Sequence, residues 1–243
     1  MNSDSIYLDK KTVEDFTFNS SVSQVFDDMV SRSIPHYIDA QKLIADFVKN
    51  NINDNSNVYD LGCATGTSIV LLHQTVRDNK QLKYVGIDNS VFMLEKAKQK
   101  LNQHFESPDQ FELIEADITK FDNFQKTGCV LLNLTLQFVR PIKRIDLITK
   151  LYDNMQFGGI LALFEKVVDS NMQFNRDYIN MYHDFKRQNH YSEIEISRKR
   201  EELENVLIPY TEQENYEMLK LAGFEKISTI FKYLNFAVIL AVK

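Results

Sequence analysis

Apolar runs of strand length alternate with amphipathic segments of helix length through the middle of the chain. The apolar runs predict strands over 57–61, 83–88, 111–116, 129–135 and 159–166. The segments between them predict helices over 67–78, 90–104 and 141–155, and the pair Gly158-Gly159 supplies a turn into the fifth strand. Strands that are apolar almost throughout, with helices between them, are typical of a parallel sheet covered on both faces. The pattern therefore predicts a doubly wound α/β fold with right-handed crossovers.

The end of the chain follows a different pattern. A predicted helix over 212–222 ends at Gly223, and two predicted strands follow over 224–233 and 236–242. Only two residues separate these strands, which is enough for a hairpin and too short for a crossover, so the last strand must be antiparallel to its neighbour. We therefore expect a seven-stranded, mostly parallel sheet with an antiparallel C-terminal hairpin strand. This architecture resembles that of class I S-adenosylmethionine-dependent enzymes.

The remaining segments are expected to surround this sheet within a single domain. Residues 1–20 are polar and read as a flexible arm, and 21–52 contain two amphipathic helical patterns that would form a lid over the ligand edge of the sheet. The cofactor-binding core is expected over 53–168. A helical insertion for substrate binding or dimerisation is expected over 169–206, and the C-terminal helix and hairpin over 207–243.

A glycine-bearing turn follows the first predicted strand. The segment Asp60-Leu61-Gly62-Cys63-Ala64-Thr65-Gly66 places an acid, small residues and glycines between a strand and a helix, as a nucleotide-cradling turn requires. Taken alone, this pattern also fits a turn with no ligand. The residues that follow the turn favour a ligand-binding site, because the next three strands end in Asp88-Asn89, Asp117-Ile118 and Asn133. The carboxyl ends of parallel strands form the ligand edge of open α/β sheets, and Asp88 is placed to hold the hydroxyls of a ribose.

Composition narrows the class of protein. The chain of 243 residues is 44% hydrophobic, which suffices for one large core. Its 28 Lys and Arg against 34 Asp and Glu give a net charge of −6, which offers no broad attraction for a nucleic acid. The two cysteines, Cys63 and Cys129, have no metal-ligand spacing and are expected to be reduced thiols. With no signal-peptide pattern or membrane-spanning run, we expect a cytoplasmic protein without a metal.

Several further side chains have two interpretations. Tyr37 follows the Ile34-Pro35 break and either points into the site or is a core tyrosine with a solvated hydroxyl. Arg32 is either a ligand or a solvated cation at a helix end. Each cation of the insertion, Arg200 included, taken alone fits an exposed basic helix face. As a group, these cations lie where class I folds carry the inserted segments that determine substrate specificity. His183 beside Asp184 is expected to be structural, because adjacent helical residues point in different directions.

With these residues placed, the chain resembles the carboxy-S-adenosyl-L-methionine synthase family from about Phe18 to its end. The segments that carry the resemblance are FDDMVSRSIPHY, VYDLGC, IDNS, LNLTLQF, YHDFKRQNHYSEIEIS, KR, LENVL and the GF before the hairpin. The helical insertion is the most specific of them. The sequence departs from the family pattern after Cys63, where Ala64-Thr65-Gly66 stands in place of Ser-Leu-Gly, which puts a side-chain hydroxyl contact there in doubt.

The resemblance implies an activity and a set of residues. The family forms carboxy-S-adenosylmethionine, phenylpyruvate and water from S-adenosylmethionine and prephenate, and its product serves the 5-oxyacetyl modification of the tRNA wobble uridine. By position, the implied contacts to S-adenosylmethionine are Tyr37, Gly62, Cys63, Ala64, Asp88, Asn89, Asp117, Ile118, Asn133 and Arg200. Tyr37 and Arg200 would also be catalytic, and Arg32 and Tyr191 are weaker candidates for the second substrate. Arg200 would pair with the new carboxylate through two hydrogen bonds.

The resemblance also implies a homodimer that binds no nucleic acid directly, in which Arg200 acts either in its own subunit or across the interface. Prephenate would bring its own base, because its aromatisation releases hydroxide and carbon dioxide beside the activated methyl group. Two alternatives remain at this point. One is a conventional S-adenosylmethionine-dependent methyltransferase acting on tRNA or a small molecule, and the other is a binding protein with an inactive pocket.

Overall fold

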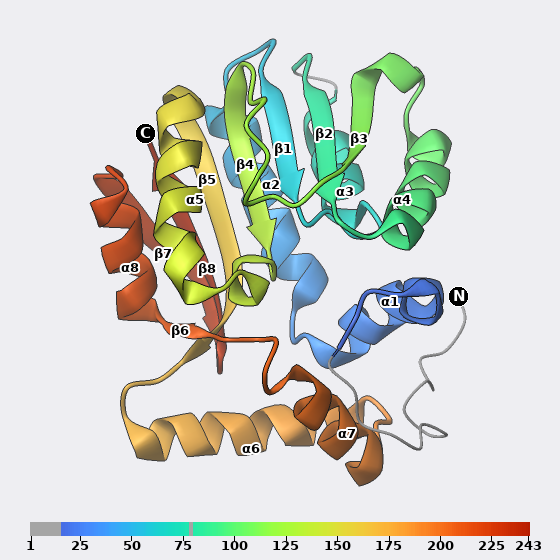
Figure 1. Ribbon diagram of the computed structural model, residues 1–243, viewed down its shortest axis with the longest axis vertical. Coiled ribbons are helices and arrows are strands. Elements are labelled where there is room, and N and C mark those ends of the chain that lie inside the picture. The colour runs from blue at the N-terminus through green and yellow to red at the C-terminus, as the bar shows by residue number, and fades with distance from the viewer. Residues whose placement is uncertain (1–15, 78–79) are drawn as a thin grey trace.

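A mostly parallel sheet forms the centre of the protein in a computed structural model that describes residues 16–77 and 80–243 (Figure 1). The strands of the main sheet run in the order β3-β2-β1-β4-β5-β8-β7. Their bounds are β1 Asn57–Leu61, β2 Lys83–Asp88, β3 Phe111–Glu115, β4 Thr127–Asn133, β5 Met155–Val168, β7 Lys226–Tyr233 and β8 Phe236–Val242. The first five are parallel, and β8 is antiparallel to both β5 and β7. A short β6, Tyr210–Thr211, pairs with β5. The predicted sheet with its antiparallel hairpin strand is confirmed.

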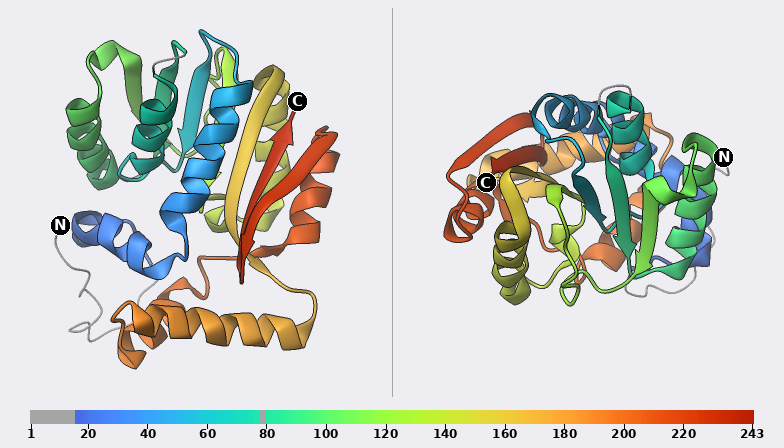
Figure 2. Two further views of the ribbon diagram at one scale, coloured as in Figure 1. Left: turned by 180° about the vertical axis from the view of Figure 1, so that it is seen from behind. Right: turned by 90° about the horizontal axis from the view of Figure 1, so that it is seen from above.

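Helices cover both faces of the sheet (Figure 2). One face is covered by α2 Tyr37–Asn51, α3 Thr67–Val76 and α4 Val91–His104, and the other by α5 Pro141–Asn154 and α8 Glu212–Leu221. Successive strand residues alternate between the two cores: Val58 packs in the first and Tyr59 in the second, as do Cys129 and Val130. This two-residue period explains why the strands are apolar at nearly every position.

Three further helices lie beyond the carboxyl ends of the parallel strands (Figure 1). They are α1 Ser20–Ser33, α6 Met172–Gln188 and α7 Glu193–Leu203. Asn19 caps α1 through its side chain, and Ser192 with Glu195 forms a capping box at α7. Both predicted N-terminal helices and the helical insertion are therefore present, but only α1 lies beyond the ligand edge, because α2 packs its apolar side chains on one face of the sheet. Most of the predicted arm, residues 1–15, lies outside the described part of the chain.

Two boundaries predicted from the sequence are wrong. Gly158-Gly159 does not form the turn into the fifth strand, because β5 begins at Met155, directly after α5. The pair lies instead in an irregular stretch of β5, where the pairing with β4 shifts and Gly158 has φ 78°. The fourth strand ends at Asn133 rather than 135, because Leu134 adopts φ 58° and turns the chain into a short 3-10 helix, η2 Leu136–Phe138. A second 3-10 turn, η1 Pro108–Gln110, precedes β3.

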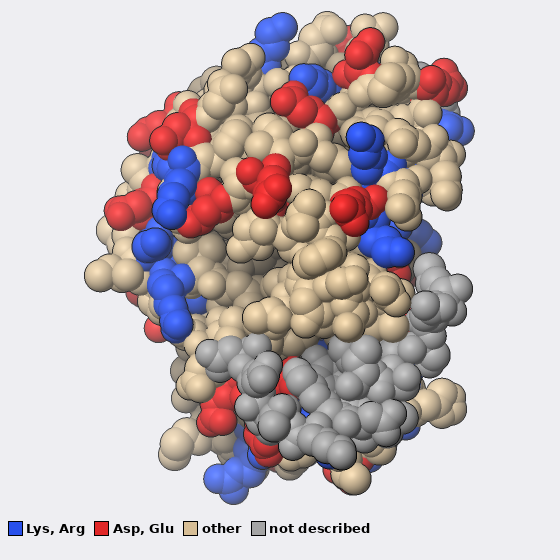
Figure 3. Space-filling model, turned by 45° about the vertical axis from the view of Figure 1, so that its right-hand side comes forward, with Lys and Arg blue, Asp and Glu red and all other residues tan. Residues whose placement is uncertain are grey.

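The outer surface carries mixed charge. On the face shown in Figure 3, Lys and Arg side chains lie among Asp and Glu and form no continuous basic area. In the described part of the chain, none of the helices combines the length and apolarity needed to span a bilayer.

Candidate active site

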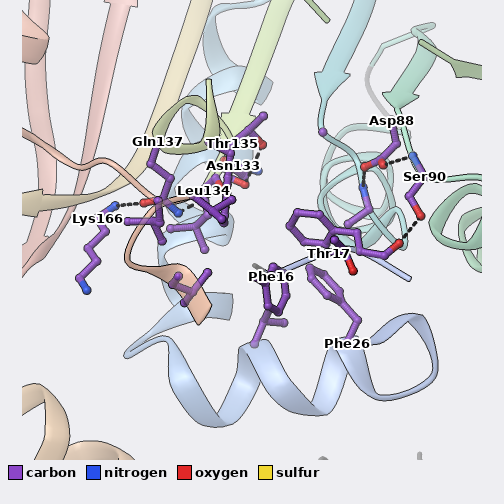
Figure 4. A pocket seen from close by; sticks show the side chains of 18 of the residues that line it. Phe16, Thr17, Phe26, Asp88, Ser90, Asn133, Leu134, Thr135, Gln137 and Lys166 are labelled. Carbon is purple, nitrogen blue, oxygen red and sulfur yellow. Dashed lines mark hydrogen bonds between the residues drawn. The ribbon is translucent and has the colours of Figure 1, made fainter. Parts of the chain in front are cut away.

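A cavity of about 1170 Å³ opens between the carboxyl ends of the strands and the helices α1, α6 and α7 (Figure 4). All ten residues predicted to contact S-adenosylmethionine line this central cavity: Tyr37, Gly62, Cys63, Ala64, Asp88, Asn89, Asp117, Ile118, Asn133 and Arg200. They come from six separate segments of the chain. The topology thus brings the predicted cofactor residues to one place.

The turn after β1 is built by backbone contacts. Gly62 has φ 73°, and a Cβ there would lie 2.5 Å from Thr135 Oγ1, so only glycine fits. The amides of Gly62 and Cys63 both donate to the carbonyl of Ile87, at 2.7 and 3.1 Å. Ala64 also has positive φ, at 45°, and its amide donates to Asp88 Oδ2 at 2.9 Å. The turn is therefore held against the end of β2.

Asp88 is placed to serve a ribose. It is buried, and its Oδ1 accepts the amide of Ser90 at 2.9 Å while its Oδ2 accepts that of Ala64. Burial raises the pKa of the Asp88 carboxyl, although the hydrogen bonds from Ser90 and Ala64 oppose this effect. A carboxylate has further lone pairs, so two backbone donors still leave acceptor capacity for hydroxyl groups.

Asp117 and Ile118 form the wall at the end of β3. Asp117 Oδ1 accepts both the amide and the hydroxyl of Thr119, at 2.9 and 2.7 Å. Partial burial pushes the pKa of Asp117 upward, but the two Thr119 hydrogen bonds together with the charges of Lys120 and Lys143 outweigh it, and the pKa is lowered. Ile118 is half-buried and packs on the second core. An ionised acceptor beside an apolar side chain is suited to the edge and face of a purine.

A chain of polar side chains joins the end of β4 to α2. Asn133 Nδ2 donates to Ser68 Oγ at 2.8 Å, and Ser68 Oγ donates to Gln41 Oε1 at 2.7 Å. Among the described residues, buried Asn133 Oδ1 has no hydrogen-bond partner. Such a group is costly to leave unpaired, and Asn133 lines the cavity together with Tyr37. The residues present therefore fit a polar ligand with both donors and acceptors.

Tyr37 begins α2, lines the cavity and packs against the first core. Burial raises the pKa of its phenol, with a hydrogen bond to Gln41 acting in the opposite direction. The phenol therefore stays protonated at neutral pH and acts as a hydrogen-bond donor.

Two buried acids lie beside segments that line the cavity, and their roles were not predicted from the sequence. Asp60 is 1% exposed, its Oδ2 has no partner, and burial together with the nearby Asp88 raises its pKa to about 7. Glu165 accepts the amides of Thr135 and Leu136 through Oε1, at 3.0 and 2.8 Å, and that of Gln137 through Oε2 at 3.1 Å. Burial raises the pKa of Glu165 to about 8. A glutamate inside an apolar strand was the available signal.

Thr65 explains part of the departure from the family pattern. Its hydroxyl donates to Asp27 Oδ1 of α1 at 2.6 Å and accepts from Lys100 Nζ of α4 at 2.9 Å. Lys100 also pairs with Asp27 Oδ2 at 2.7 Å. The hydroxyl of this turn thus fastens the lid helix α1 to the body.

Arg200 lies on α7, is exposed, and lines the central cavity of its own chain. Arg32 and Tyr191 are not among the lining residues of the cavity. The guanidinium of Arg32 lies 4.4 Å from the ring centroid of Tyr191 and donates to the carbonyl of Asn189 at 3.0 Å. Their predicted contact with the second substrate stays a prediction, and in the structure they join α1 to the turn between α6 and α7.

The cavity also contains a cation that the sequence analysis did not single out, Lys166 near the end of β5. Two cations of the predicted insertion, Lys186 on α6 and Lys199 on α7, line it as well, together with His183 of α6. Burial lowers the pKa of His183, and the nearby Lys186, Arg187, Lys166 and Arg200 lower it further. Among the described residues, no cluster of His, Cys, Asp or Glu is arranged to hold a metal ion.

Known proteins resemble the chain over its whole length. Residues 52–223 match the family model described as a methyltransferase domain. The chain is 42% identical to the carboxy-S-adenosyl-L-methionine synthase of Desulfotalea psychrophila over 240 residues, which covers 99% of this chain and 97% of that protein. It is 45% identical to the synthase of Wolinella succinogenes, over 94% of this chain and 93% of that protein.

Solved structures share the fold at low sequence identity. A putative O-methyltransferase from Nostoc punctiforme superposes with a TM-score of 0.67 at 18% identity, over 92% of this chain and 59% of the larger protein. Human N-acetylserotonin methyltransferase in complex with S-adenosylmethionine gives a TM-score of 0.61 at 17% identity, over 92% of this chain and 55% of that protein. These likenesses confirm the class I methyltransferase fold. The full-length identity to the curated relatives shows that the chain belongs to the carboxy-S-adenosyl-L-methionine synthase family.

Proposed function

We propose that this protein converts S-adenosylmethionine and prephenate to carboxy-S-adenosylmethionine, phenylpyruvate and water. The observation that supports the proposal most is that Arg200 lines the same cavity as Asp88, Asn133 and the glycine turn. A guanidinium at this position is a binding group for a carboxylate. A methyl acceptor does not require one.

The adenosyl part of the substrate is held by the residues at the strand ends. Asp88 accepts the ribose hydroxyls, and Asp117 with Ile118 contacts the adenine. Asn133 Oδ1, which has no partner among the described residues, and the phenol of Tyr37 bind the polar groups at the methionine end. S-adenosylmethionine supplies a methyl group activated by the adjacent sulfonium.

The second substrate supplies the carboxyl group and the base. Prephenate loses carbon dioxide and hydroxide and becomes aromatic, the hydroxide takes a proton from the methyl group to form water, and the carbon dioxide forms a bond to that carbon. The chain itself therefore has to hold two molecules in contact, exclude water and offer positive charge. Arg200 offers this charge to the carboxylate being formed.

The test is the mass of the nucleoside product. The protein is incubated with S-adenosylmethionine, with and without prephenate carrying ¹³C in its ring carboxylate. A product heavier by one labelled carbon dioxide, formed only with prephenate, is expected. Methylation of an acceptor without prephenate would favour a conventional methyltransferase instead, and bound nucleoside with no product would favour an inactive binding protein.

We also propose a cytoplasmic homodimer whose product serves a separate enzyme of tRNA wobble uridine modification. Exposed apolar side chains on α6, namely Met172, Phe174 and Met181, support a subunit contact there, and light scattering coupled to gel filtration tests it. Both cysteines are free and buried, which suits a reducing compartment. The net charge of −6 supports a role without direct tRNA binding.

A further inference from the structure

The central cavity is lined by charged groups of both signs, among which carboxylates gather at the ends of two strands and three lysines gather elsewhere. Three of its carboxylates, Asp88, Glu115 and Asp117, lie at the ends of β2 and β3. Lys166, Lys186 and Lys199 lie on the other side, at the end of β5 and on α6 and α7. Figure 4 shows Lys166 and Asp88 on opposite sides of the cavity. A nucleoside with ribose hydroxyls fits the acidic side, which leaves the basic side for an anion.

Lys166 differs from the other two lysines in its surroundings. In the part of the chain that the structure describes, no carboxylate pairs with its ammonium group, and the centroid of the Tyr182 ring lies 5.3 Å from Nζ. The Tyr182 ring is also contacted by Lys186 Nζ at 4.6 Å. Burial lowers the pKa of Lys166 from its usual value of 10.5. Lys166 is half-buried, and a partly desolvated cation without a counterion is stabilised by an anionic ligand.

The backbone of Lys166 is tied to the loop that follows Asn133. Its amide donates to Gln137 Oε1 at 3.1 Å, and Gln137 Nε2 donates to the carbonyl of Leu134 at 3.1 Å (Figure 4). On the other side, Lys166 pairs in register with Phe236 of β8, whose ring packs edge-on against Tyr182. The backbone from which the Lys166 side chain extends is therefore rigid, and its position relative to Asn133 is fixed.

We propose that Lys166 binds a carboxylate of prephenate, on the β5 side of the cavity. The inference rests on the proposed function and deepens it, since it names the chain's own group for the second substrate. Arg200 is assigned to the carboxylate being formed on the nucleoside, and Lys166 to the anion that delivers it. Both cations line the central cavity.

The experiment compares Lys166→Met and Lys166→Arg with the wild type. Methionine keeps the length and volume of the side chain without its charge, and arginine restores the charge. With S-adenosylmethionine saturating, Lys166→Met should raise KM for prephenate by about 10-fold to 100-fold, which is the range for a hydrogen bond to a charged group. The KM for S-adenosylmethionine should change by less than about 3-fold, and Lys166→Arg should recover most of the loss. Lys83→Met is the control, because Lys83 begins β2 at the far end of the sheet and pairs with Glu112.

Direct binding separates this inference from the proposed function. Prephenate is titrated into each protein loaded with S-adenosylhomocysteine, which carries no methyl group to react. If the wild type binds prephenate and Lys166→Met binds it equally well, the inference is overturned while the function can stand. If the wild type binds prephenate but forms no carboxylated product, and Lys166→Met loses the binding, the inference holds and the proposed function fails. If the wild type neither binds nor converts prephenate, both are overturned.

Discussion

The Asp88 carboxylate and the Ala64 amide are joined by a 2.9 Å hydrogen bond, which links the end of β2 to the turn after β1. The same carboxylate accepts the amide of Ser90 through its other oxygen, at 2.9 Å. One side chain therefore sets the geometry of two loops that line the cavity and is also placed to bind ribose. Loss of its charge should affect ligand binding more than folding.

Asp88→Asn should weaken the binding of S-adenosylhomocysteine by about 10-fold to 100-fold, measured by isothermal titration calorimetry. An amide has one oxygen and one NH2 group, so it must turn a donor toward either the Ala64 or the Ser90 amide. The matched control is Glu112→Gln on β3, which removes an exposed carboxylate that pairs with Lys83 at 2.7 Å. An unchanged affinity in Asp88→Asn would contradict the assigned role.

Gly62→Ala should lower the free energy of unfolding by more than Gly158→Ala does. Both glycines have similar φ, 73° and 78°, so alanine meets the same left-handed strain at about 1–2 kcal/mol. Nothing lies within 4 Å of a Cβ at Gly158, whereas a Cβ at Gly62 collides with Thr135. The clash should add about 1–3 kcal/mol in urea denaturation.

Thr135→Ala combined with Gly62→Ala tests the origin of that difference. Removal of the Thr135 hydroxyl and methyl group takes away the two nearest atoms, at 2.5 and 2.6 Å from the added Cβ. The double variant should therefore approach Gly158→Ala in its loss of stability. Equal losses in Gly62→Ala and the double variant would show that the clash is relieved in some other way.

The residues at the strand ends could be predicted because a parallel sheet places every carboxyl end at one edge. Asp88, Asp117 and Asn133 were found in this way, and the structure places all three at the cavity. The resemblance to the family supplied Tyr37 and Arg200, which lie on helices outside the sheet. Periodicity alone does not determine which way such residues face.

The contacts that hold the segments around the cavity in place could not be predicted, because they join residues that are distant in the sequence. Glu165 and Lys166 are neighbours on β5, yet the alternation of the strand sends one to the loop of η2 and the other toward α6. The pairing of Arg32 with Tyr191 depends on how α1 packs against the turn after α6. The irregular stretch at Gly158 depends on the register with β4, which the sequence of β5 does not contain.

Asp60 should make the unliganded protein less stable as the pH rises. Burial raises its pKa from 3.8 to about 7, so between these values the folded state holds a proton that the unfolded state has lost. Raising the pH through this window removes that proton, and the free energy of unfolding falls until about pH 7. Asp60→Asn cannot titrate and should lose less stability between pH 4.5 and pH 8 in thermal or urea denaturation.

Glu165 contributes to the same measurement in both proteins. The pKa of Glu165 is raised from 4.5 to about 8, so its carboxyl lowers the free energy of unfolding over a range that extends to higher pH. This contribution remains in Asp60→Asn. The informative quantity is therefore the difference between the two stability curves. Curves that stay parallel from pH 4.5 to pH 8 would contradict a buried, raised carboxyl at Asp60.

Arg200→Ala should abolish the prephenate-dependent carboxylation of S-adenosylmethionine and weaken the binding of S-adenosylhomocysteine by no more than a few fold. The reason is that S-adenosylhomocysteine carries no carboxylate at the position that Arg200 is proposed to bind, whereas the product does. Product mass measures the first effect and calorimetry the second. Arg200→Lys should restore little of the activity, because an ammonium cannot make the two parallel hydrogen bonds of a guanidinium.

Arg187→Ala is the control for Arg200→Ala, because it removes a guanidinium that lies on α6 and pairs with Asp184 and Glu193 on the surface. It should keep full carboxylation.

Mixed dimers formed from Arg200→Ala and Asp88→Asn chains show which subunit supplies Arg200. The assay uses S-adenosylmethionine at a concentration that the Asp88→Asn site does not bind. Since Arg200 lines the cavity of its own chain, a mixed dimer should then have no intact site and no activity. Recovery of about a quarter of wild-type activity, the share expected if half of randomly paired chains are mixed dimers with one complete site, would show that Arg200 acts across the interface instead.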